Sequence, residues 1–397
     1  MRFHRKVRRN NIDAFFALLR AGLWSNDKLN LDVDFDGVDW GEVYQLAEDQ
    51  SVVGLVAAGI DSFKEKNTQD SQARMSDQGS STSFKCPQEW ALQFIGSTLQ
   101  IEQQNKDMNA FVARLIERLR KKDIYAVLVK GQGIAQCYER PLWRANGDVD
   151  LLLSDDNYAK AKDYLIPLAS SVETEDKGSK HLGMQIDSWE VELHGSLRVG
   201  LPYRINNVLN KIKEEIFYGG YVRSWLNGNT QIFLPGINAD VVYVFVHFFN
   251  HFYKGGIGLR QICDWCRLLW TYRESLNHEY LESKIREAGL ISEWKAFYNL
   301  ASRYLGMPDL DSRFMVYDSR YDKKADRIME FILEVGNMGH NRDMSYYDKY
   351  PYVVRKLYSM KMRVDDLINH ARIFPLDSLS FFPRIMFNGL RSAARGE

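Results

Sequence analysis

Two aspartates one residue apart, Asp148 and Asp150, begin the apolar segment GDVDLLL at residues 147–153. On a β-strand, alternate side chains point to the same face, so the two carboxylates would lie about 7 Å apart on one side of a sheet. Like charges this close repel each other, and a bound cation would offset the repulsion. The pair therefore predicts a divalent metal site. The same pattern would also suit an ordinary strand start with one capping and one solvated aspartate.

A third carboxylate is available in WEVELHGSL (189–197), where Glu190, Glu192 and His194 alternate with apolar residues and share one face of a strand. Either glutamate could lie beside the aspartates if the two strands are neighbours. Mg²⁺ is a hard cation that is usually bound by a few carboxylates together with substrate phosphates. Two such ions can stabilise both oxygens of an in-line phosphoryl displacement, so this set of residues indicates phosphoryl chemistry.

The segment VLVKGQG (127–133) has the features of a phosphate-binding turn. It ends a strand in glycines where a helix begins, and backbone N–H groups at such a junction bind anions. Lys130 adds a positive charge at the same place, although a lysine is also ordinary at the end of a strand.

The longer segment VLVKGQGIAQCYERPLWRANGDVDLLL (127–153) resembles the signature of the uncharacterised bacterial nucleotidyltransferase family, within the DNA polymerase β-like nucleotidyltransferase superfamily. The family's Glu-Leu-His strand falls on residues 192–194, which favours Glu192 over Glu190 as the third carboxylate. The resemblance covers roughly residues 120–275. Its matching positions are Lys130-Gly131, Tyr138 with Pro141, Arg144, Asp148-Val149-Asp150, Glu192-Leu193-His194, His247, His251, Arg260 and Asp264.

The resemblance implies transfer of a nucleotidyl group from a nucleoside triphosphate, such as ATP, to an acceptor hydroxyl, with release of pyrophosphate. It implies that Asp148, Asp150 and Glu192 are the catalytic residues and hold Mg²⁺ or Mn²⁺, and that Glu192 helps to deprotonate the acceptor.

In the same scheme the nucleotide-binding residues are Lys130, Gly131, Gly133 and Arg144. The glycines would line the phosphates, and Lys130 or Arg144 would neutralise developing charge. Arg144 could instead brace its loop by pairing with Asp148 or Asp150. Gln132 departs from the superfamily pattern, in which Gly or Ser is usual at this position.

Five further residues are candidates for the pocket: His194, His247, His251, Arg260 and Asp264. His194 is expected either to support the carboxylates or to pack within its strand. His247 and His251 lie four residues apart on a predicted helix, a spacing that suits a shared metal. The glutamate of a HExxH zinc motif is missing, so they are expected to line the nucleotide or acceptor pocket, or to be interior histidines.

The pattern of apolar residues predicts the elements that position these side chains. Strands are expected over 124–131, 147–153, 181–187 and 189–197, with a hairpin at 227–229 and a helix over 155–168. Helices are expected over 11–24, 40–60, 88–120, 238–254, 257–275, 278–305 and 323–337. Residues 61–87 are polar and rich in Ser and Gln, which predicts a mobile loop.

The fold class is therefore α+β: a nucleotidyltransferase-like mixed β-sheet core at 121–235, flanked by an N-terminal helical region (1–120) and a helical C-terminal domain (236–397). The final part, 352–397, is basic. It is expected to be a solvated helix face, or less often a contact for phosphate-rich ligands or a membrane surface.

Composition sets wider limits on the class of protein. The 397 residues carry 52 basic and 52 acidic side chains, so the chain lacks the positive charge of a general nucleic-acid or membrane binder. The longest apolar run, 241–249, is too short for a transmembrane segment. The basic N-terminus is expected to begin an amphipathic helix and not a signal peptide. Four cysteines do not make a disulfide scaffold, and Cys263 and Cys266 are expected to be structural. A cytoplasmic location is expected.

The sequence thus predicts a Mg²⁺-dependent nucleotidyltransferase that binds a nucleoside triphosphate and an unidentified acceptor, which could be a small molecule, a protein or RNA. The alternative is a catalytically degenerate protein that binds nucleotide or a partner, antitoxin-like or regulatory. Gln132 is the main feature in favour of this alternative.

Overall fold

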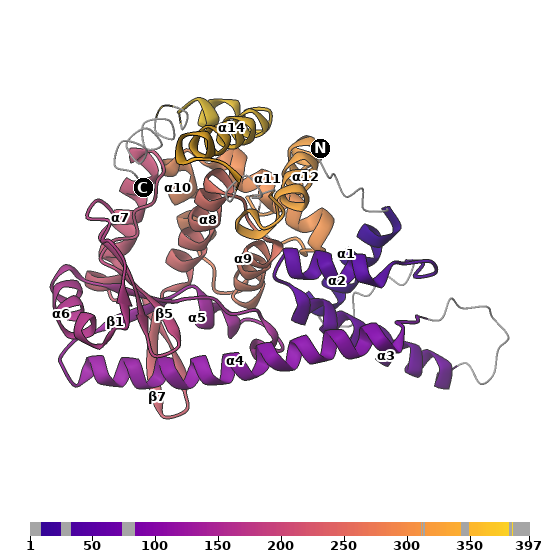
Figure 1. Cartoon of the computed structure of the whole chain (residues 1–397), viewed down its shortest axis with the longest axis horizontal. Helices are drawn as coiled ribbons and strands as arrows, with labels where there is room; N and C mark the ends of the chain where they lie inside the picture. Colours follow the sequence, from indigo (N-terminus) through magenta and orange to yellow (C-terminus); the bar gives the residue numbers. More distant parts are fainter. Residues whose placement is uncertain are drawn as a thin grey trace.

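A seven-stranded mixed sheet surrounded by helices makes this an α+β protein (Figure 1). The structure is a computed structural model, and it describes residues 9–24, 33–73, 84–310, 312, 314–342, 349–380 and 383. The expected class, a mixed sheet with helices before and after it, is confirmed.

The strand order in the sheet is β3-β4-β5-β2-β1-β7-β6. In the centre, β2 pairs antiparallel with β1 and parallel with β5. The hairpins β4–β5 and β6–β7 form the two sides of the sheet, and their turns fall at 187–188 and 228–229, as the sequence predicted. The strands are β1 (Ala126–Val129), β2 (Val149–Leu153), β3 (Ser171–Val172), β4 (His181–Ile186), β5 (Trp189–His194), β6 (Val222–Asn227) and β7 (Thr230–Pro235).

Helices before the sheet are α1 (Arg9–Leu23), α2 (Trp40–Asp49), α3 (Val53–Ala73) and α4 (Gln88–Arg120). Within and after the sheet follow α5 (Gly131–Ala135), α6 (Asp155–Leu165), α7 (Tyr203–Tyr218), α8 (Ile237–Lys254), α9 (Leu259–Thr271), α10 (His278–Ala288), α11 (Ile291–Leu305), α12 (Asp322–Val335) and α14 (Tyr352–Ala371). Short 3₁₀ turns are η2 (Pro141–Trp143), η3 (Ile166–Leu168), η4 (Ser319–Tyr321) and η5 (Asn337–Gly339).

The two faces of the sheet have different coverings, because alternate residues of each strand point to opposite sides. Leu128, Leu151 and Leu193 belong to a core that includes the C-terminal half of α4 and residues of α6. Val129 and Leu152 point to the other side, into the large core that includes α7, α8 and α9. Polar side chains on the same face of the sheet as Leu152 therefore face the C-terminal helices.

Three predicted elements were wrong. The expected helix 40–60 is two helices, α2 and the start of α3, which are separated at residues 50–52, where Ser51 has a φ of +56°. Residues 61–73 are not a loop, because α3 continues to Ala73; residues 74–83 of the expected loop lie outside the described residues. Lys, Glu and Gln favour a helix interior, and a single buried Phe63 anchors this part of α3 to the core. The predicted helix 278–305 is two helices, α10 and α11, because Gly289 adopts a left-handed conformation (φ +69°) that ends α10.

Two further elements, α7 and the short β3, were not predicted at all.

No described helix combines the length and the apolar character needed to cross a bilayer. The basic C-terminal segment is described only in part. Over 352–371 it forms α14, whereas Arg384, Arg391 and Arg395 lie outside the described residues.

Candidate functional site

Three carboxylates meet at the end of β2. The parallel register of β2 and β5 places Asp150 directly opposite Glu192, and Asp148 immediately precedes β2. One carboxylate oxygen from each of the three residues lies within 4.8 Å of the others. The strand alternation that put the two aspartates on one face also selects Glu192, because it is the glutamate level with Asp150.

These carboxylates line a cavity of about 530 Å³ between the sheet and the C-terminal helices. Gly131 and Lys130 border it at the end of β1, and α8 and α9 supply side chains opposite the carboxylates. The residues that line the cavity include Lys130, Gly131, Asp148, Asp150, His181, Glu192, His194, Arg198, Tyr243, His247, His251, Lys254 and Arg260.

Asp150 is almost completely buried, with 1% of its surface exposed. Its Oδ1 atom accepts from Lys130 Nζ at 2.5 Å and lies 2.7 Å from His194 Nε2. Its Oδ2 atom is buried and has no hydrogen-bond partner among the described residues. A buried carboxylate oxygen without a partner is costly, and with Asp148 and Glu192 nearby the donor set fits a hard divalent cation.

Lys130 reaches Asp150 through an unusual backbone conformation. Its φ is +58°, and that of the following Gly131 is +37°, so the chain turns sharply between β1 and α5. A non-glycine residue in such a conformation costs about 1–3 kcal/mol and is typical of functional sites. Burial by itself would lower the pKa of Lys130, but the carboxylates, Asp150 foremost, outweigh it and raise that pKa. The lysine is therefore a charged counter-ion of the cluster.

Glu192 is held by two imidazoles. His181 Nε2 lies 3.1 Å and His194 Nε2 3.3 Å from Glu192 Oε2. Burial opposes ionisation of Glu192, but these hydrogen bonds and the charge of Lys130 outweigh burial and lower its pKa. Glu192 is thus an anion at neutral pH.

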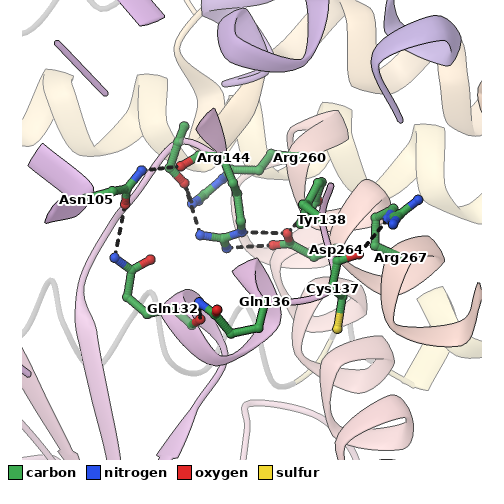
Figure 2. A network of polar contacts seen from close by, with 10 residues as sticks. Asn105, Gln132, Gln136, Cys137, Tyr138, Arg144, Arg260, Asp264 and Arg267 are labelled. Atoms are coloured by element: carbon green, nitrogen blue, oxygen red, sulfur yellow. Dashed lines mark hydrogen bonds and ion pairs between the residues drawn. The ribbon is translucent and has the colours of Figure 1, made fainter. Parts of the chain in front are cut away.

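Arg144 does not pair with Asp148 or Asp150, contrary to the predicted alternative. It forms a bidentate ion pair with Asp264, with Nε–Oδ1 and Nη2–Oδ2 distances of 2.6 and 2.7 Å, and Tyr138 donates to the same carboxylate (Figure 2). The pair is buried, so Arg144 and Asp264 join α9 to the loop before β2. The sequence could not identify this partner, because Asp264 lies 120 residues further along the chain.

Gln132, the residue that departs from the superfamily pattern, has a structural partner. It is buried, and its Nε2 donates to Asn105 Oδ1 of α4 at 3.0 Å. Asn105 in turn donates to the carbonyl oxygen of Leu142 and to that of Arg144, each at 2.8 Å. Figure 2 shows Gln132, Asn105 and Arg144 in this network. Asn105 was not predicted. The sequence feature that could have identified it is a polar residue on the buried face of α4, between Thr98 and Met108.

Gly133 lies away from the cavity, whereas Gly131 lines it. A Cβ atom on Gly133 would come within 2.7 Å of Leu234 Cδ2, so this glycine allows α5 to pack closely against β7. The expectation that Gly133 lines the phosphates was therefore wrong. Of the two glycines, only Gly131 is placed for that role.

The histidines of α8 face the same cavity. His247 and His251 are linked by an Nε2–Nε2 hydrogen bond of 3.1 Å, and Tyr243 packs one turn earlier. Burial, reinforced by the charge of Lys130, lowers the pKa of both, to about 4 for His251. Neither belongs to a group of three possible metal ligands among the described residues. They are neutral residues of the cavity wall.

Arg260 is a cation of the cavity wall near the aspartates. Its Nη1 donates to the carbonyl oxygen of Ala145 at 3.0 Å, and no acidic side chain in the described part of the chain lies within 4.0 Å of it. Burial lowers its pKa. Arg198 and Lys254, which the sequence did not single out, add positive charge elsewhere on the cavity wall.

Cys263 and Cys266 are buried free thiols on α9. Burial raises the pKa of both, which keeps them protonated and unreactive.

The protein has an α+β fold, and its carboxylate cluster has the oxygen donors that a hard divalent cation takes. Comparison with known families makes the class specific: the family model described as "Uncharacterised nucleotidyltransferase" matches residues 36–306, so the chain belongs to that family. No protein of curated function matched the chain.

Among solved structures, a crystal structure of an antigenic nucleotidyltransferase-like protein from Paracoccidioides brasiliensis is similar over 54% of this chain and 95% of that one. The sequence identity is 12% and the TM-score 0.30. A likeness this low has no bearing on the site.

Proposed function

We propose that this protein is a Mg²⁺- or Mn²⁺-dependent nucleotidyltransferase. It would transfer a nucleoside monophosphate from a triphosphate, such as ATP, to an acceptor hydroxyl and release pyrophosphate. The observation that carries the proposal is the convergence of Asp148, Asp150 and Glu192 on the wall of a 530 Å³ cavity, where Asp150 Oδ2 lacks a partner. Membership of the nucleotidyltransferase family supports the same reaction class.

The metal would be held by Asp148, Asp150 and Glu192, whose oxygen donors suit a hard cation. When bound, Mg²⁺ would neutralise phosphate oxygens and lower the pKa of a coordinated hydroxyl. Asp150 Oδ2 has no hydrogen-bond partner among the described residues, so a cation would bind there while Lys130 Nζ keeps its contact with Oδ1. Lys130 also lines the cavity, where its ammonium group would face a phosphate of the nucleotide.

Other residues would act on the nucleotide directly. Gly131 lines the cavity at the sharp turn after β1, beside Asp148, and has no side chain to block a phosphate. Arg260 has no ion-pair partner among the described residues and lies next to the start of β2, where it can stabilise negative charge on the phosphoryl group or on the leaving pyrophosphate. Arg144 is already committed to Asp264, so we assign it to positioning the loop.

The acceptor would approach from the side of α8. Tyr243, His247 and His251 face the cavity there, and neutral imidazoles can donate to or accept from a hydroxyl group. The zero net charge of the chain favours a small-molecule or protein acceptor over a long nucleic acid.

The alternative, a protein without catalytic activity, rested on Gln132. Its hydrogen bond to Asn105 explains the presence of glutamine at this position by a structural role that is independent of catalysis. The catalytic proposal therefore stands as the first choice. A reducing, cytoplasmic location is part of the proposal, because all four cysteines are free thiols.

The proposal is tested with α-labelled nucleoside triphosphates, Mg²⁺ or Mn²⁺ and cell extract, comparing the wild type with the double variant Asp148→Ala/Asp150→Ala. We expect label on one acceptor class with the wild type only. The matched control is Asp163→Asn, which changes an exposed aspartate on α6 and should label like the wild type. Equal labelling by wild type and double variant, or no pyrophosphate release with any nucleotide, would exclude the proposed activity.

A further inference from the structure

His181 on β4 lies beside the carboxylate cluster although nothing in its local sequence marks it. The antiparallel register of β4 and β5 pairs it with His194. His181 exchanges both of its backbone hydrogen bonds with Asp176 on its other side, so its pairing with His194 is of the non-hydrogen-bonded kind. Side chains approach most closely in such pairs, and the two imidazole centroids are 4.9 Å apart.

The two rings point the same nitrogen at one oxygen. Nε2 of His181 and Nε2 of His194 lie 3.1 and 3.3 Å from Glu192 Oε2. Glu192 is two residues before His194 on the same face of β5, so the three donors come from two rigid, paired strands. Their ligand atoms lie within 4.8 Å of one another, as do those of the three carboxylates.

Hydrogen bonding does not account fully for this arrangement. His194 Nε2 faces two carboxylates at once, Asp150 Oδ1 at 2.7 Å and Glu192 Oε2 at 3.3 Å. A single N–H group can donate well to only one of them. A divalent cation between the two imidazole nitrogens and Glu192 Oε2 would satisfy these three atoms together and leave Asp150 Oδ1 to Lys130.

We propose that His181, His194 and Glu192 form a second cation site that takes a borderline transition-metal ion such as Zn²⁺. Two imidazoles and one carboxylate are the ligand set of many catalytic zinc sites, which leave a fourth position for water or substrate. Imidazole nitrogen favours Zn²⁺ or Co²⁺ over Mg²⁺, which distinguishes this site from the carboxylate site that shares Glu192.

The surroundings of this site allow a metal ion to enter and leave one coordination position open. The side chains of His181 and Glu192 are 31% and 19% exposed, and both line the cavity. The inference concerns metal binding by the free protein, so it goes beyond nucleotide transfer and does not depend on that reaction.

The test uses full-length protein freed of metal by a chelator and titrated with Co²⁺ in the absence of nucleotide. We expect one Co²⁺ to bind with the intense visible absorption of a low-coordinate, nitrogen-ligated ion. Zn²⁺ should displace it at equal concentration, and a large excess of Mg²⁺ should not. His181→Ala and the more conservative His181→Gln should both weaken binding by roughly 100-fold or more, with unchanged thermal unfolding of the metal-free protein.

Two control variants separate the sites. Asp148→Asn alters only the carboxylate site and should keep the Co²⁺ spectrum, while His340→Ala removes an exposed histidine that does not line the cavity and should change nothing. Co²⁺ binding that survives both His181 variants, or that is lost with Asp148→Asn alone, would overturn the proposal. Failure of the nucleotidyl transfer assay with an intact, His181-dependent spectrum would count against the reaction and not against this site.

Discussion

At the scale of single residues, Arg144, which was predicted to bind nucleotide, lines the cavity but is held by a partner that the sequence did not identify. Its guanidinium is buried and fully engaged with Asp264 and the carbonyl oxygen of Ala145. An arginine in that state contributes to a site by fixing the backbone around it, here the loop that leads into Asp148.

Arg144→Met should therefore destabilise the protein. It leaves the buried Asp264 carboxylate without its counter-charge, and breaking a buried ion pair in this way costs about 3–5 kcal/mol. Urea denaturation followed by fluorescence would measure the loss. The matched control is Lys211→Met, which breaks the exposed pair with Glu287 and should cost less than about 1 kcal/mol. Equal, small effects of both substitutions would show that Arg144 is available for another role.

The sequence predicted which carboxylates would converge but not what surrounds them. Asp148, Asp150 and Glu192 could be grouped because a period of two is a property of any strand and because the family pattern made two strands neighbours. Asn105, His181 and Tyr243 could not be assigned to the site in the same way. They arrive from α4, β4 and α8, and only the packing of these elements brings them to it.

At the scale of elements, strands and hairpins were more predictable than helix limits. The turn at 187–188 has a local signal, an aspartate that tolerates positive φ, and the register of β4 and β5 follows from it. The extent of α3 and the break at Gly289 depend on which apolar side chain finds a core and on one glycine conformation. The amino-acid composition of these segments therefore predicts neither the end of α3 nor the break at Gly289.

Helix α14 is attached to the rest of the molecule through a histidine that must remain neutral. His370 is buried against Phe252 and Tyr253 of α8 and Phe331 of α12. Burial lowers the pKa of His370 to about 3, from an ordinary value of about 6.5.

This depressed pKa predicts a defined pH dependence of stability. Between about pH 6.5 and 3 the unfolded chain binds a proton at His370 that the folded chain does not, so stability falls as the pH falls, by up to about 1.4 kcal/mol per unit. His370→Phe should remove this contribution and reduce the difference in unfolding free energy between pH 7 and pH 4.5. His340→Phe, at an exposed position, should leave it unchanged. An identical pH slope in wild type and His370→Phe would contradict the assignment.

At the scale of the whole molecule, the three regions expected from the sequence share one core. The larger hydrophobic cluster runs without interruption from Phe15 of α1 through Val129 of the sheet to Phe249 of α8 and Phe374 after α14. The boundaries 1–120, 121–235 and 236–397 remain predictions of where domains begin and end. The shared core has a consequence for the folding of these regions.

A fragment spanning 121–235 should not fold alone, because it would expose the face of the sheet that α8 and α9 cover. We expect the isolated fragment to lack near-ultraviolet circular dichroism and a cooperative denaturant transition, whereas the full chain has both. A fragment with native-like dispersion in its proton NMR spectrum would establish the sheet as an independent domain.

Helix α4 has a mechanical consequence for the site. Its 33 residues extend about 50 Å, from α2 and α3 at one end to β6 and β7 at the other (Figure 1). Near its middle, Asn105 donates hydrogen bonds to the backbone carbonyl oxygens of Leu142 and Arg144. Arg144 lies four residues before Asp148. Asn105 thus couples α4 to the loop that leads into Asp148, so a displacement of α4 along its axis would also move this loop.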